Sequence, residues 1–81
     1  MNWIRRKDEL IQQLSPEVAR FVLQALVRLE QENIFDAPGM ISGVVRQMRT
    51  ANSDVVRGAV NRTERVLKST FARGCLQRVG A

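Results

Sequence analysis

The sequence predicts an all-α protein, a small bundle of about four helices whose second half has the proportions of a helix-turn-helix. Apolar residues recur at spacings of three and four along most of the chain, which is the period of an amphipathic helix. No stretch of the sequence shows the strict alternation of apolar and polar residues that is typical of a strand. Two breaks, near 36–39 and 50–53, are rich in residues that end or begin helices.

The length of the chain predicts a single domain. Its 81 residues suffice for one hydrophobic core. We expect a helical domain over 1–74 and a frayed tail over 75–81. A chain of this size buries only about 60% of the surface that its unfolded form exposes. Pairing with a second copy would add buried surface, so we expect a homodimer.

The first expected helix covers residues 3–14. The apolar residues there follow the helical period, with Lys7 as an interruption. Ser15, Pro16 and Glu17 then provide a cap, a residue suited to the first helical position and a favourable charge for the start of a second helix. The apolar stripe of this second helix is expected to form either the core or a dimer seam, and it consists of Val18, Phe21, Val22, Ala25, Leu26 and Leu29.

A third helix is expected from about Pro38 to Arg49, with Asp36 as its cap. Its inner stripe comprises Ile41, Val44, Val45 and Met48.

The fourth expected helix covers 53–71, and either Asn52 or Ser53 can cap it. This helix is amphipathic with a basic outer face. Its inner stripe comprises Val56, Val60, Thr63, Leu67 and Phe71, and we expect Val55 and Ala59 to pack inward as well. The outer arc comprises Arg57, Asn61, Arg62, Arg65 and Lys68.

The charge of the chain is concentrated in its second half. The net charge is +5, and residues 41–81 carry eight arginines and lysines against two carboxylates. Seven of those eight cations are arginine, the side chain suited to bidentate contacts with phosphate and guanine. Such a face predicts an acidic partner, with nucleic acid first among the candidates.

The residue types present argue against an enzyme, a metal site or a cofactor. The sequence has no histidine and no tyrosine, and its single cysteine, Cys75, has no histidine to activate it. The five glycines do not form a phosphate-binding loop. A secretory signal and an apolar run long enough to span a membrane are also missing, so we expect a cytoplasmic protein.

These features predict a small DNA-binding regulator in which the helix after residue 53 enters the major groove. The base-edge candidates are Arg57, Asn61 and Arg62. The phosphate candidates are Arg49, Thr50, Asn52, Ser53, Arg65 and Lys68.

A second hypothesis is a helical protein-interaction module, an adaptor or inhibitor. It would bind an acidic protein surface or a second copy of itself, with the doubly apolar helix over 18–29 as the seam. The basic amphipathic helix could instead lie on an anionic membrane, but its only aromatic residue is Phe71, which makes this the weaker interpretation.

Overall fold

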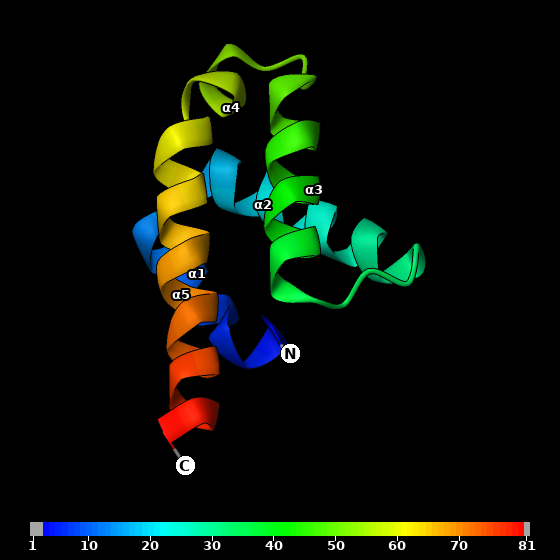
Figure 1. Ribbon diagram of the computed structural model, residues 1–81. Coiled ribbons are helices and arrows are strands. Elements are labelled where there is room, and N and C mark those ends of the chain that lie inside the picture. The colour runs from blue at the N-terminus through cyan, green and yellow to red at the C-terminus, as the bar shows by residue number, and fades with distance from the viewer. Residues whose placement is uncertain (1–2, 81) are drawn as a thin grey trace.

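The computed structural model describes the backbone of residues 3–80 and the side chains of residues 5–71. All of its elements are helical, as the sequence predicts (Figure 1). A 3-10 turn, η1 (Trp3–Arg6), leads into α1 (Lys7–Gln13) and α2 (Pro16–Gln31). The second half contains α3 (Ala37–Arg49), α4 (Asp54–Gly58) and α5 (Val60–Gly80).

Three of the helices begin at side-chain caps that the sequence predicts. The Ser15 hydroxyl accepts a hydrogen bond from the Val18 amide at 3.5 Å, and Pro16 occupies the first position of α2. The Asp36 carboxylate accepts from the Gly39 amide at 2.8 Å at the start of α3. Of the two candidates for the next cap, the structure selects Ser53. Each cap satisfies an amide that the first turn of a helix leaves unpaired.

The α2 helix ends through the backbone conformation of Asn33, whose φ angle is 64°. This left-handed conformation lets the Asn33 amide donate to the Glu30 carbonyl and the Ile34 amide donate to the Leu29 carbonyl, at 3.0 and 2.9 Å. The pair of bonds is the Schellman motif, and asparagine tolerates the left-handed region better than most residues do. This motif ends α2 and turns the chain toward α3.

The core lies where α2 crosses the other helices (Figure 1). Within one chain, α2 buries its predicted apolar stripe completely except for Phe21, which is partly buried. Gly43 allows the close approach of α2 and α3, because a Cβ atom there would lie 2.5 Å from a methyl carbon of Leu29. The expected dimer remains a prediction.

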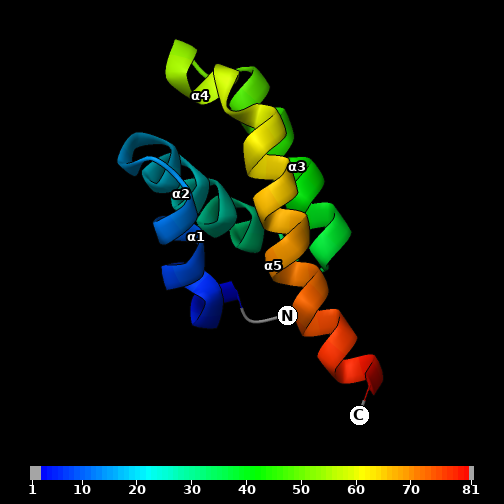
Figure 2. The ribbon, with the colours of Figure 1, turned by 90° about the vertical axis from the view of Figure 1, so that its left-hand side faces the viewer.

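The predicted break at residues 50–53 is present, but the helix that follows it is not continuous. The chain turns again at Ala59, whose amide donates to the Val56 carbonyl in a 3-10 fashion, so that α4 and α5 are separate. Figures 1 and 2 show α4 lying across the end of α3, whereas α5 runs back beside α3 in the opposite direction. The predicted inner stripe stays buried on both sides of the second turn, since Val56, Val60 and Thr63 are all buried.

Val55 does not pack inward as expected, because 54% of its surface is exposed. Beyond Phe71 the backbone remains helical to Gly80, so the residues expected to form a tail continue α5 as far as the structure describes them. The side chains of Trp3, Ile4 and Cys75 lie outside the described residues. The domain boundary at 74 stays a prediction.

Gly43 and Gly58 form a matched pair for testing helix packing. A Cβ atom at Gly58 would meet nothing within 4 Å, so Gly58→Ala should raise the free energy of unfolding by about 0.5–1 kcal/mol through helix propensity. Gly43→Ala gains the same propensity but crowds Leu29, at a cost of about 1–3 kcal/mol, so we expect a net loss of stability. Urea unfolding measures both; equal effects would contradict the close crossing of α2 and α3.

Thr63 and Thr70 are fully buried, and their hydroxyl oxygens have no hydrogen-bond partner. Replacing a buried, unpaired hydroxyl with a methyl group of similar shape removes a desolvation cost. We therefore expect Thr63→Val to raise the free energy of unfolding by about 1 kcal/mol in thermal or urea unfolding. The exposed Thr50→Val is the control and should bring no such gain; a loss of stability in Thr63→Val would show that its hydroxyl is satisfied.

Candidate nucleic-acid interface

The turn between α3 and α4 is fixed by the hydroxyl group of Ser53. The Ser53 oxygen accepts from the Val56 amide at 3.3 Å, which caps α4. The same hydroxyl donates to a carboxylate oxygen of Glu17 at 2.6 Å, a length typical of a charge-assisted bond. Glu17 belongs to the first turn of α2, so this one side chain holds the turn against the N-terminal half of the chain.

Arg57 is engaged within the same turn. Its guanidinium donates to the carboxylate of Asp54 and to the backbone carbonyl of Ala51. Asp54 is 94% exposed in its side chain, so the ion pair contributes little to stability by itself. The pair matters more for the charge of the surface, because Arg57 offsets the negative charge of Asp54, which would otherwise repel a phosphate.

The exposed side of α5 carries Asn61, Arg62, Arg65 and Lys68, which we call the α5 basic face. The Lys68 ammonium pairs with Glu64 at 3.6 Å. None of the ion pairs among the described residues involves Arg62 or Arg65. The Arg62 guanidinium donates to the backbone carbonyl of Gln13 at 3.4 Å. Because a carbonyl carries no net charge, this bond does not compensate the positive charge of Arg62.

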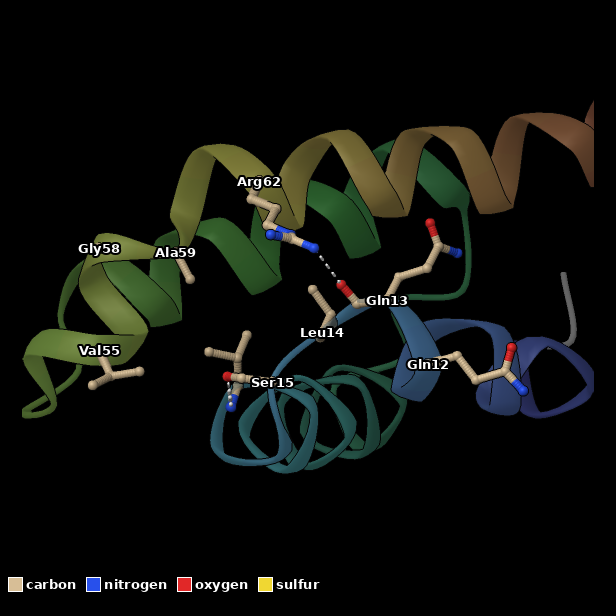
Figure 3. A pocket seen from close by; sticks show the side chains of 9 residues that line it. Gln12, Gln13, Leu14, Ser15, Val55, Gly58, Ala59 and Arg62 are labelled. Carbon is tan, nitrogen blue, oxygen red and sulfur yellow. Dashed lines mark hydrogen bonds between the residues drawn. The ribbon is translucent and has the colours of Figure 1, made fainter.

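A shallow groove runs between the end of α1 and the start of α5, and we call it the α1–α5 groove (Figure 3). One part has a volume of about 540 Å³ and lies between the α1–α2 junction and α4. A second part, of about 410 Å³, continues along α5. Figure 3 shows Arg62 reaching down from α5 across the opening to Gln13. The residues that line the two parts include Gln12, Gln13, Val55, Gly58, Arg62, Arg65 and Ser69.

The remaining predicted site residues separate into two groups. Arg49, Thr50 and Asn52 are exposed at the turn, next to the Ser53 cap. The Thr50 hydroxyl donates to the carbonyls of Arg46 and Gln47 at 3.3 and 3.2 Å, so it serves the end of α3. The α2 stripe belongs to the core, where Phe21 is partly buried and Val18 reaches the floor of the groove between α1 and α5.

Sequence patterns do not reveal the contribution of α1 to this surface. Gln12 and Gln13 are polar, exposed and without charge, and they reach the groove only because α1 packs against α5. Exposed amides of this kind occur on most helices, so the sequence contains no signal that distinguishes them.

No protein-family model matches the chain, and no match was found among curated proteins or solved structures. Among the described residues, no group of three or more histidine, cysteine, aspartate or glutamate side chains is placed to hold a metal ion. Within the same residues, no helix has the length and apolar character needed to cross a bilayer.

The Ser53 hydroxyl should contribute more to stability than its neighbour Thr50. Ser53→Ala removes a helix cap and the bond to Glu17, so we expect the free energy of unfolding to fall by about 1–2 kcal/mol. Thr50→Ala removes only bonds to carbonyls at the end of α3 and should cost less than about 0.5 kcal/mol. Urea unfolding of the two variants side by side measures the difference, and equal losses would contradict the joint role of Ser53.

Proposed function

We propose that the protein binds duplex DNA through the α5 basic face and acts as a small DNA-binding regulator. The observation that carries the proposal is the charge of Arg62 and Arg65. Both are exposed, both line the same groove, and neither has a carboxylate partner among the described residues. Uncompensated arginines on one helix face favour phosphate contacts, which provide most of the affinity of DNA-binding proteins.

Pairing of the local acids supports the same proposal. Asp54 is bound by Arg57, and Glu64 by Lys68. Because these carboxylates are neutralised by their neighbours, the field outside α5 is dominated by Arg62 and Arg65. A surface that carries only positive charge attracts a polyanion such as DNA over about one Debye length, about 10 Å at moderate salt.

The proposal rests on charge more than on the helix-turn-helix motif. A turn follows α3 at the place where the motif would have one, and Arg49 and Asn52 are exposed there where they can contact phosphates. However, α5 runs antiparallel to α3 instead of crossing it steeply, as the second helix of the motif does (Figure 2). Since Arg57 is engaged in the turn, we assign the base contact to Asn61 and phosphate contacts to Arg62, Arg65 and Lys68.

Salt-dependent titration of mixed-sequence duplex DNA tests the proposal. The double variant Arg62→Gln/Arg65→Gln should bind about tenfold or more weakly at low salt, and the slope of log affinity against log salt should fall by about 2. Fluorescence anisotropy over a range of salt concentrations measures both quantities.

The matched control removes the same charge elsewhere. Arg28 and Arg46 are exposed and line a separate groove between α2 and α3, so Arg28→Gln/Arg46→Gln should keep most of the affinity and the slope. If the unaltered protein shows no binding to duplex DNA at low salt, or if the two double variants weaken binding equally, the α5 basic face is not a DNA site.

A second candidate function is protein binding through the outer side of α2. Val27 is 44% exposed, and with Leu23, Gln24, Arg28 and Gln31 it lines a shallow groove of about 460 Å³. An exposed apolar side chain in a groove favours a helical partner or a second copy. The mass of the protein in solution, measured alongside the titration, reports self-association at this side.

A further inference from the structure

We infer that the α1–α5 groove seats the sugar-phosphate backbone of one DNA strand, which makes Gln13 of α1 a phosphate contact. The inference rests on the proposed function and adds α1 as the second side of the binding site. In this arrangement α5 presents Arg62 and Arg65 to the strand from one side, and the end of α1 contacts it from the other.

The two parts of the groove meet at Gln13 and Arg62, and we call them together the channel. Gln13 and Arg62 line both parts, and the bond from the Arg62 guanidinium to the Gln13 carbonyl ties α1 to α5 at their junction. The Gln13 side chain rises from the end of α1 toward α5 in Figure 3. Its amide nitrogen donates to the Glu9 carbonyl at 3.2 Å and has a second hydrogen to offer.

The lining chemistry of the channel complements a phosphodiester. The charged side chains that line it are the arginines Arg62 and Arg65, and no carboxylate lines either part. Amides and hydroxyls of Gln12, Gln13, Ser15 and Ser69 account for the other polar groups. A phosphodiester offers only acceptors and negative charge, so cations and neutral donors are the groups that recognise it. Glu9, one turn before Gln13, is paired with Arg6 at 3.3 Å.

The spacing along α5 favours a strand over a single anion. Arg62, Arg65 and Ser69 follow one another along the channel, and at 1.5 Å per residue they span roughly 10 Å. The phosphates of one DNA strand recur about every 3.4 Å of the duplex axis and lie farther apart along the strand itself, so this length can face roughly two neighbouring phosphates. A repeated anion therefore matches the row of donors, whereas an isolated phosphate would engage only one end.

Gly58 leaves room for the strand where it enters. It lines the first part of the channel, and a Cβ atom at this position would meet nothing within 4 Å. The absence of a side chain lets a ligand approach the α4 backbone closely. It also makes the position suited to a test, because Gly58 lines the channel and a Cβ atom added there meets no neighbouring atom.

The first experiment compares two neutral substitutions in the same duplex titration. Gln13→Ala should weaken DNA binding about three- to tenfold while leaving the salt slope unchanged, because the lost contact carries no charge. Gln24→Ala removes an equally exposed amide from α2 and should leave the affinity unchanged. If Gln13→Ala and Gln24→Ala bind alike, α1 does not contact the strand.

The second experiment places a charge inside the channel. Gly58→Glu and Gly58→Gln add side chains of nearly the same shape, so their difference isolates charge from bulk. We expect Gly58→Glu to bind duplex DNA more than tenfold more weakly than Gly58→Gln, because like charges placed together are strongly unfavourable. Equal affinities would overturn the inference, and urea unfolding of both variants confirms that each is folded.

The outcomes separate the inference from the proposed function. If the unaltered protein shows no salt-dependent binding to duplex DNA, both the proposed function and the inference are wrong. Binding that depends on Arg62 and Arg65 but not on Gln13 or Gly58 keeps the proposed function and overturns the channel. Displacement of the duplex by low concentrations of inorganic phosphate at constant ionic strength would indicate a site for a free anion and would also overturn it.

Discussion

The Ser53 hydroxyl links the turn between α3 and α4 to the start of α2, at the point where the chain reverses toward α5. It caps α4 by accepting from Val56 and is tied to α2 by donating to Glu17. Because α4 has only five residues, it does not form a stable helix by itself and requires this cap and the burial of Val56. From α4, which lies across the end of α3, the chain turns at Ala59 into α5, which runs back along α3 (Figure 2).

Because α5 runs back along α3, its basic residues and its buried residues lie on opposite sides of the helix. Thr63, Leu67 and Phe71 are buried, so Arg62 and Arg65 must be directed outward. The same geometry pairs the nearby acids with other cations, Asp54 with Arg57 and Glu64 with Lys68. The uncompensated charge of the surface is therefore a consequence of where the core lies and of which short-range ion pairs the helical spacing permits.

The helices and their caps could be predicted because they depend on local chemistry. Ser15, Asp36 and Ser53 act within three residues of the amides that they cap, and the apolar period identifies the buried side of α2. The second turn at Ala59 could not be predicted, since the spacing of Val56, Val60 and Thr63 is the same whether or not the helix bends. The bend sets α4 against α2, and these two helices are distant in sequence.

The candidate site shows the same division between local and distant contributions. The exposure of Asn61, Arg62, Arg65 and Lys68 follows from helical spacing, whereas Arg57, predicted on the same arc, lies on α4 and is bound within the turn. The α1–α5 groove exists because α1, ending at Gln13, packs against a helix that begins nearly fifty residues later, at Val60. Arg62 belongs both to the basic face and to the groove. Its charge is visible in the sequence, whereas its bond to the Gln13 carbonyl exists only in the fold. Through this bond Arg62 links the basic side of α5 to the end of α1, which forms the other side of the groove.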